Sequence, residues 1–135
     1  YYNITYYNRM VNVYECKKMA KELGDNCHNT KNRIIEKMTE ANKKDCKKLG
    51  NYLQSLMVIE SLSSYICVCC CEHETLSPSI ISELKNKCKG LVKVSNTLIG
   101  SMDKETCDYI RCNEMITFCE KCINIKREKS KTKKK

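Results

Sequence analysis

The sequence predicts an all-α fold, a compact disulfide-stapled bundle of about five helices. Three observations support this: few turn residues, helical apolar spacing and many cysteines. One Pro and four Gly in 135 residues are too few for the turns between many short strands, and apolar residues recur at spacings of three and four. Twelve cysteines are near the frequency of disulfide scaffolds, and their even number allows six bridges. We therefore expect one cysteine-rich helical domain over residues 1–125.

Two helices are expected in the first third of the chain. The first carries one stripe of apolar residues and cysteines, namely Val13, Cys16, Ala20, Leu23 and Cys27. The second, over about residues 29–40, carries Ile34, Ile35 and Met38. Both stripes repeat every three or four residues, as the buried face of an amphipathic helix does.

Three further helices are expected after residue 44. Asp45 can cap a third helix, and Ser77 before Pro78 gives the clearest start signal, for a fourth helix that Gly100 closes. Asp103 opens the fifth. Their shared faces hold Cys46, Leu49, Leu53 and Leu56, then Ile81, Leu84, Cys88, Leu91 and Leu98, and finally Cys112, Met115, Cys119 and Cys122.

The densest cysteine run, YICVCCCEHE over residues 65–74, predicts a disulfide hub. On a helix, Cys67 and Cys71 share a face, Cys70 lies about 60° away and Cys69 points to the opposite side, so one element can reach several neighbours. Adjacent cysteines rarely pair, because a bridge needs suitably spaced Cα atoms. All twelve are candidate disulfide residues of unknown pairing, namely Cys16, Cys27, Cys46, Cys67, Cys69, Cys70, Cys71, Cys88, Cys107, Cys112, Cys119 and Cys122.

Metal binding and redox chemistry are the alternatives for these cysteines. A zinc site would combine Cys69, Cys71 and His73 with Cys119 and Cys122, but the last two lie in a helical stripe and not in a knuckle turn. The same pair has CxxC spacing without a strand-turn-helix context. We expect neither a metal nor another cofactor.

No motif in the chain predicts catalysis. Residues 70–74, CCEHE, differ in spacing from the CC-x-x-H-D motif of secretory phospholipases and lack its Asp, and no glycine-rich calcium loop is present. His28 precedes a helical segment, where a polar surface or capping role is favoured. Neither a nucleophile elbow nor an HExxH pattern occurs. We predict a protein that binds and is not an enzyme.

The first residues carry signals about the compartment. The opening YYNITYYN has no initiator Met and no apolar signal segment, which favours a mature secreted, extracellular chain. Asn3 begins an Asn-x-Thr glycosylation sequon, and no run approaches the roughly 18 apolar residues of a membrane span. Four tyrosines are expected either to contact a partner or to pack on the bundle, namely Tyr1, Tyr2, Tyr6 and Tyr7.

The last ten residues, 126–135, hold +6 of the formal net charge of +9. We expect a disordered basic tail, although such a tail also attracts polyanions or acts as a localisation signal. No aromatic residue is interleaved with its basic residues, so base stacking is not indicated. The candidate polyanion-binding residues are Lys126, Arg127, Lys129, Lys131, Lys133, Lys134 and Lys135.

Residues 107–112, CDYIRC, resemble one of the two Cys-Tyr-Cys motifs of the BICYCLE proteins, which are secreted salivary effectors of gall-forming aphids. Residues 65–67, YIC, resemble the other motif without the Cys before the Tyr, so Tyr65 and Tyr109 are the family-motif tyrosines. The resemblance covers residues 46–122. It implies delivery in saliva into plant tissue, where the protein would bind host macromolecules and alter host development or defence.

A second resemblance is to the GDNF-receptor-alpha domain, a disulfide-stapled helical bundle that binds a growth factor. Residues 46–49 with Tyr52, followed by Cys67-Val68-Cys69, resemble its helix and C-x-C pair, but the full cysteine ladder does not align. This implies an extracellular ligand-binding module by analogy of fold. A polyanion-binding salivary protein is the third alternative. A weak echo between residues 46–67 and 88–112 is typical of internal duplication, and chance explains it equally well.

Overall fold

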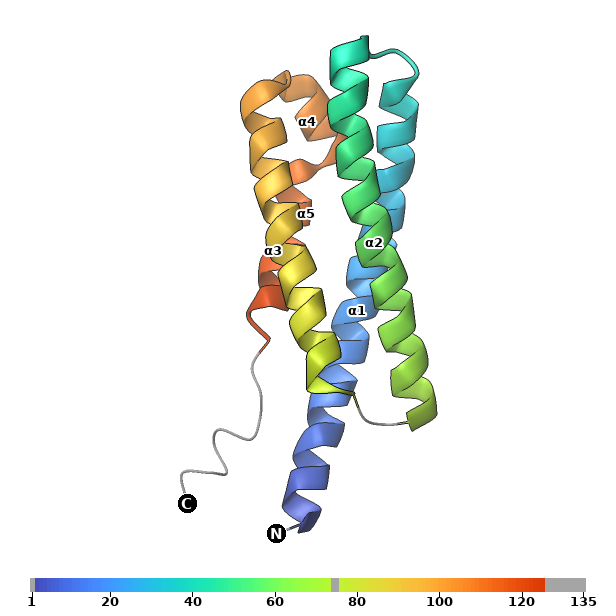
Figure 1. Ribbon diagram of the computed structural model, residues 1–135, viewed down its shortest axis with the longest axis vertical. Helices are drawn as coiled ribbons and strands as arrows, with labels where there is room; N and C mark the ends of the chain where they lie inside the picture. Colours follow the sequence, from blue (N-terminus) through green and yellow to red (C-terminus); the bar gives the residue numbers. More distant parts are fainter. Residues whose placement is uncertain (1, 74–75, 126–135) are drawn as a thin grey trace.

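The computed structural model describes the backbone of residues 2–73 and 76–125 and the side chains of residues 14–70 and 76–125. These residues form five helices and no strand, namely α1 (Tyr2–Met38), α2 (Lys43–His73), α3 (Pro78–Ser101), α4 (Lys104–Ile110) and α5 (Cys112–Ile123). The predicted all-α fold is confirmed. α1 and α2 form an antiparallel hairpin, α3 packs beside α2, and α4 with α5 returns between α3 and α1 (Figure 1). This is a four-helix bundle whose last arm is divided in two.

The first arm is one continuous helix where the apolar pattern predicted two. No Gly or Pro lies between Cys27 and Ile34, and the buried stripe continues through Thr30 at the same spacing. His28 and Asn29 are weak helix formers, but each lowers helix stability by less than about 1 kcal/mol. Packing of the stripe against α2 outweighs that loss. The predicted boundary near residue 29 is therefore wrong.

Side-chain caps determine where three of the helices begin. The Ser77 hydroxyl accepts the backbone N–H two residues later at 3.3 Å, and the Asp103 carboxylate accepts the N–H three residues later at 2.9 Å. Both predicted helix starts are confirmed. In α2 the cap is the Asn42 side chain, which accepts the N–H of Asp45 at 2.8 Å. Asp45, the predicted cap, instead lies in the first turn of α2.

The last arm breaks at Arg111, which the apolar stripe placed inside a helix. Arg111 adopts the left-handed conformation, with φ 61° and ψ 47°, and no other non-glycine residue of the described chain has a positive φ. A side chain there costs about 1 to 2 kcal/mol, so packing on both sides must hold the break. The predicted and observed numbers of helices agree only because two errors cancel. The predicted break near residue 29 is absent, and the observed break at Arg111 was not predicted.

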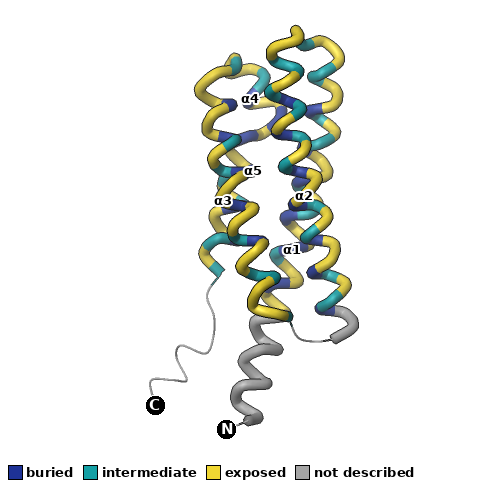
Figure 2. Tube along the Cα trace, viewed as in Figure 1, coloured by how far each residue is buried: buried dark blue, intermediate teal, exposed yellow. Residues whose placement is uncertain are grey.

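The core runs the length of the bundle along the inward sides of the helices (Figure 2). Tyr52 is its largest fully buried side chain, and its hydroxyl accepts a hydrogen bond from the Ser95 hydroxyl at 2.9 Å, which ties α2 to α3. A Cβ placed on Gly24 would lie only 3.3 Å from the Cβ of Ser63. Glycine therefore allows α1 and α2 to approach closely at this point.

One helix in the described part of the chain, α2, is long and apolar enough to cross a membrane. Its most apolar window has a mean hydropathy of 1.5, and 28% of that window is buried. The core helix of a soluble bundle meets the same criteria. The expectation that the chain has no membrane span therefore stays a prediction.

Candidate functional site

The cysteines are the side chains best able to carry chemistry, and most of them point into the core. Seven of the twelve lie on the predicted helical stripes. The buried cysteines are Cys16, Cys27, Cys70, Cys88, Cys107, Cys112, Cys119 and Cys122. Cys46, Cys67 and Cys69 are half-buried. No two cysteines whose side chains are described are joined by a disulfide. The predicted bridges are therefore not confirmed and stay a prediction.

Four of these cysteines meet in the bundle interior, and we call them the sulfur cluster: Cys27 of α1, Cys88 of α3, and Cys119 and Cys122 of α5. Cys88 lies within hydrogen-bonding reach of both Cys119 and Cys122. Cys27 is close enough to Cys88 and Cys122 for their charges to interact. All four side chains are at most 2% exposed. Their small size lets α5 pack closely on two neighbouring helices.

The environment of the sulfur cluster makes its thiols poor nucleophiles. Burial raises the pKa of Cys27 from 9.0 to about 12. The hydrogen bond with Cys119 is the largest cause that raises the pKa of Cys88 to about 12, and the hydrogen bond with Cys88, followed by burial, raises the pKa of Cys122. A rise of about three units makes the reactive thiolate roughly a thousandfold scarcer at neutral pH. The cluster suits packing or bridging and not nucleophilic catalysis.

A second pair of buried thiols lies at the α4–α5 break. Cys107 and Cys112 are within hydrogen-bonding reach of each other, and the Cys107 thiol also donates to the Leu98 carbonyl at 3.6 Å. Burial raises the pKa of Cys112 to about 12. In an unbroken helix, residues five apart point about 140° away from each other. The left-handed Arg111 is therefore what brings the two thiols together.

The cysteines of the predicted hub turn toward different neighbours. Cys70 is buried close to Cys16 of α1, whereas the Cys67 thiol donates to the Lys17 carbonyl at 3.9 Å. Cys69 is hydrogen-bonded to Tyr65. This divergence agrees with the expected helical arrangement of the run. No His, Cys, Asp or Glu cluster with metal-site geometry occurs among the described residues.

His28 takes part in a polar triad that links α1 to α2 at the surface. Its Nδ1 lies 3.0 Å from one oxygen of Glu60, and the Lys31 ammonium lies 2.9 Å from the other. The hydrogen bond from Lys31, helped by the one from His28, lowers the pKa of Glu60. The exposed His28 therefore has a polar surface role, as the sequence favoured.

A groove of about 580 Å³ lies beside this triad, between α1 and α2. Small side chains open it, because Ala20 and Gly24 of α1 lie opposite Ser63 and Ser64 of α2. The Ser63 hydroxyl is buried there without a hydrogen-bond partner. His28 and Glu60 also line the groove, but they bond to each other and not to the Ser63 hydroxyl, so we regard the groove as a result of helix packing.

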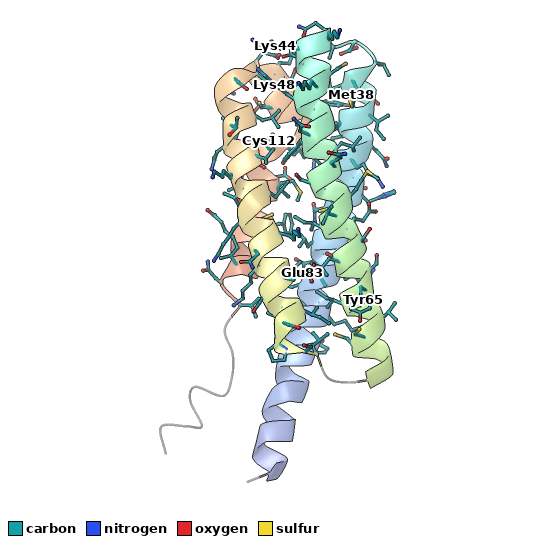
Figure 3. All side chains as sticks on the ribbon, viewed as in Figure 1. Met38, Lys44, Lys48, Tyr65, Glu83 and Cys112 are labelled. Carbon is teal, nitrogen blue, oxygen red and sulfur yellow. The ribbon has the colours of Figure 1, made fainter. Side chains whose placement is uncertain are left out.

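The two family-motif tyrosines lie at opposite ends of the bundle. Tyr65 is 55% exposed and lies near the lower end of α2 in Figure 3. Tyr109 belongs to α4 at the upper end (Figure 1), and its hydroxyl donates to the Glu36 carboxylate, which raises the pKa of Tyr109. The Lys37 ammonium lies 4.8 Å from the centre of its ring. Tyr109 therefore fastens α4 to α1, whereas Tyr65 is available for contact.

The sequence reasoning missed one surface, the outer side of α2. Its exposed residues over positions 51–68 are all uncharged, and we call them the α2 face: Asn51, Gln54, Met57, Val58, Ser61, Ser64, Tyr65 and Val68. Its four large apolar side chains are each between 47% and 55% exposed. The signal was present in the sequence, because no Lys or Arg occurs between Lys48 and Lys85 in a chain that is 30% charged.

Several candidates from the sequence lie outside the described side chains. These are Asn3, Cys71, His73, the N-terminal tyrosines and the basic residues of 126–135. Comparison of the chain with protein-family models, with curated proteins and with solved structures finds no match. The two family resemblances therefore rest on the sequence motifs.

Proposed function

We propose that this protein is a secreted effector that binds a host protein stoichiometrically and does not catalyse a reaction. The observation that carries the proposal is the α2 face, an uncharged strip on an otherwise charged bundle. The centres of protein interfaces are depleted of Lys and Glu and enriched in Tyr and Met. The α2 face has no charged residue, and its Met57 and Tyr65 are 48% and 55% exposed.

The dimensions of the α2 face suit a helix or a flat surface of a partner. Residues 51–68 extend about 25 Å along α2 at 1.5 Å per residue. The half-exposed Met57, Val58, Tyr65 and Val68 leave apolar area in contact with water in the isolated chain. Burying such area stabilises association by about 25 cal/mol per Å². Four half-exposed apolar side chains on one uncharged helix face favour an interaction site.

The buried thiols favour binding over turnover. Their raised pKa values keep Cys27 and Cys112 protonated at neutral pH, so neither supplies the thiolate that covalent catalysis needs. A bundle that cysteines hold rigid loses little conformational entropy when it binds. The same residues that argue against catalysis therefore support a preformed binding surface.

The resemblance of residues 107–112 to BICYCLE proteins supports a plant protein, met after delivery in saliva, as the partner. Of the two motif tyrosines, Tyr65 is the expected contact residue, because it is 55% exposed, whereas Tyr109 is less exposed and fastens α4 to α1 through Glu36. Tyrosine provides a large contact area with few rotatable bonds, which is typical of residues that dominate binding energy.

The test compares lysine substitutions on and off the α2 face. Val58→Lys and Tyr65→Lys each place a charge in the strip, whereas Ile99→Lys does the same at an exposed apolar residue of α3 and is the matched control. A protein captured from plant extract by the full chain would be purified and titrated against the wild type and the three variants by calorimetry.

We expect one-to-one binding by the wild type and by Ile99→Lys, and at least about tenfold weaker binding by both α2-face variants, because burying an unpaired charge is costly. The melting temperatures of all four proteins should agree. Equal affinities for all four would show that the α2 face is not the contact surface. If a small molar fraction of this chain chemically modified or cleaved all of the captured protein, stoichiometric action would be contradicted.

A further inference from the structure

The sulfur cluster contains four thiols on three helices, and the packing of these helices restricts which thiols can bond. α5 packs against both α1 and α3, whereas α1 and α3 face each other across the diagonal of the bundle. Cys27 on α1 and Cys88 on α3 therefore each have a packed neighbour in α5. Cys119 and Cys122 point inward from that helix and are both buried.

Two arrangements join α5 to both of its neighbours, and in only one of them does each bond join two cysteines that interact in the folded chain. A Cys27–Cys88 bond would span the diagonal and would leave Cys119 to bond with Cys122 inside one helical turn, where the Cβ atoms do not converge. A Cys88–Cys122 bond would leave Cys27 to bond with Cys119, whereas the cysteines whose charges interact with Cys27 are Cys88 and Cys122.

We propose that the sulfur cluster closes as two disulfides, Cys27–Cys122 between α1 and α5 and Cys88–Cys119 between α3 and α5. Cys88 is within hydrogen-bonding reach of Cys119, so a rotation of the side chains brings the sulfurs to the bond length of about 2.05 Å. Both bonds end on α5, the longer part of the divided arm. They hold α5 to both of its neighbours below the left-handed break. This pairing does not depend on what the α2 face binds.

Each bond forms by thiol–disulfide exchange with a disulfide oxidant such as oxidised glutathione. The first thiol loses its proton, and its thiolate attacks the oxidant, which gives a mixed disulfide and releases one glutathione thiolate. The second protein thiolate then displaces the other glutathione. Two protein thiols lose two electrons and two protons, and the oxidant is reduced to two thiols. Because a thiolate is needed, the bonds close during folding, before the cysteines are buried.

Trypsin separates all four cysteines, which allows a direct test on the full chain. Cleavage after lysine and arginine places Cys27 in residues 22–31, Cys88 in residues 88–89, Cys119 in residues 112–121 and Cys122 in residues 122–126. The protein would be folded with reduced and oxidised glutathione, alkylated without reduction, digested, and mapped by fragmentation mass spectrometry. We expect residues 22–31 linked to residues 122–126, and residues 88–89 linked to Cys119.

A link from Cys88 to Cys122, or alkylated thiols at these four positions, would overturn the proposal. The variant Cys27→Ser gives an independent check, because it should expose one alkylated thiol at Cys122 while the Cys88–Cys119 link persists. A new thiol at Cys88 or Cys119 in that variant would also overturn the pairing. Cys46→Ser, at a half-buried cysteine outside the cluster, is the matched control and should leave both links unchanged.

Discussion

Raising the pH of the reduced protein should destabilise it, because buried thiols resist ionisation. Burial raises the pKa of Cys27 and of Cys112 from 9.0 to about 12. The protonated thiol is the form that the folded chain prefers. The stabilisation from each thiol is therefore complete below about pH 9 and is lost as the pH rises from about 9 to 12.

The size of the effect follows from the two pKa values. Within that interval each thiol lowers the free energy of unfolding by about 1.4 kcal/mol per pH unit. Between neutral pH and about pH 10, Cys27 and Cys112 together should lower it by about 3 kcal/mol. A small domain has about 5 to 15 kcal/mol in total, so this loss is readily measured.

The assay is urea unfolding of the protein with a phosphine reductant, followed by circular dichroism from about pH 7 to about pH 10. Lysines and tyrosines titrate in part of this range, so a variant isolates the thiol. Cys27→Ala should be less stable at neutral pH, because it leaves a cavity, but should lose about 1.4 kcal/mol less than the wild type by about pH 10. The oxidised protein, in which bridged sulfurs have no proton to lose, is the second control.

Two results would refute this reasoning. One is an unfolding free energy of the reduced wild type that stays constant to about pH 10. The other is an alkaline loss in Cys27→Ala equal to that of the wild type, which would mean that Cys27 is hydrated in the folded chain. Either result would also contradict the conclusion that the buried thiols are poor nucleophiles at neutral pH.

Three further predictions concern the fold. Tyr52→Phe should lower the free energy of unfolding by about 1 to 2 kcal/mol, because the buried Ser95 hydroxyl, 2.9 Å from the phenol oxygen, loses its acceptor. In urea unfolding, the double variant Tyr52→Phe with Ser95→Ala should recover part of this loss. No recovery would contradict the explanation. Arg111→Gly should raise the free energy of unfolding by about 1 kcal/mol, because glycine adopts the left-handed conformation without strain, whereas Arg111→Ala should not raise it. Thermal melting measures both, and equal melting temperatures for the two variants would contradict this. Gly24→Ala should destabilise the α1–α2 contact, where a Cβ meets Ser63 at 3.3 Å, whereas Gly90→Ala, with nothing within 4 Å, should stabilise α3 by about 1 kcal/mol.

The helices were predictable because their buried positions repeat at helical spacing. Cys16, Ala20, Leu23 and Cys27 all lie on the predicted inner stripe. The capping residues Ser77 and Asp103 could also be recognised, since their side chains satisfy N–H groups of the next turn whatever the rest of the fold does. These features depend only on residues that are close in the sequence, so they can be recognised in a single sequence.

The break at Arg111 could not be predicted, because no Gly or Pro marks it and its conformation is held by packing on both sides. The α2 face was missed for a related reason. α2 is apolar on more than one side, and the predicted stripe located the buried Leu49 and Leu56, but only the number of neighbouring helices decides that Met57 and Val58 stay exposed. Which thiols meet in the sulfur cluster likewise depends on the order of the helices around the bundle.

The bundle also limits how many bridges one molecule can close, because three cysteines lie at one end. Cys46 is in the first turns of α2, and Cys107 and Cys112 flank the α4–α5 break at the same end (Figures 1 and 3). Cys112 is two helical turns, about 10 Å, from Cys119 along α5. Bonded cysteines need Cα atoms within about 7 Å, so this separation is too large.

Cys46 is equally remote from the other cysteines. The contact between His28 and Glu60 places Cys27 level with Glu60, which is about 21 Å from Cys46 along α2. The cysteines near residues 67–71 are about 30 Å away on the same helix. The cysteines at the same end as Cys46 are Cys107 and Cys112, so we expect any bridge of Cys46 to go to one of them and one thiol of these three to remain in the monomer.

The other nine cysteines are also odd in number, so they close at most four bridges, and the three at this end close at most one. A monomer therefore has at most five of the six bridges that twelve cysteines allow. Alkylation in denaturant without reduction should therefore add about two labels to the monomer, one of them on Cys46, Cys107 or Cys112. A disulfide-linked dimer through one of these three would satisfy the same geometry and would appear on a non-reducing gel. A monomer that takes up no label would contradict this reasoning, because all twelve cysteines would then be bridged and one bridge would have to join the two ends of the bundle.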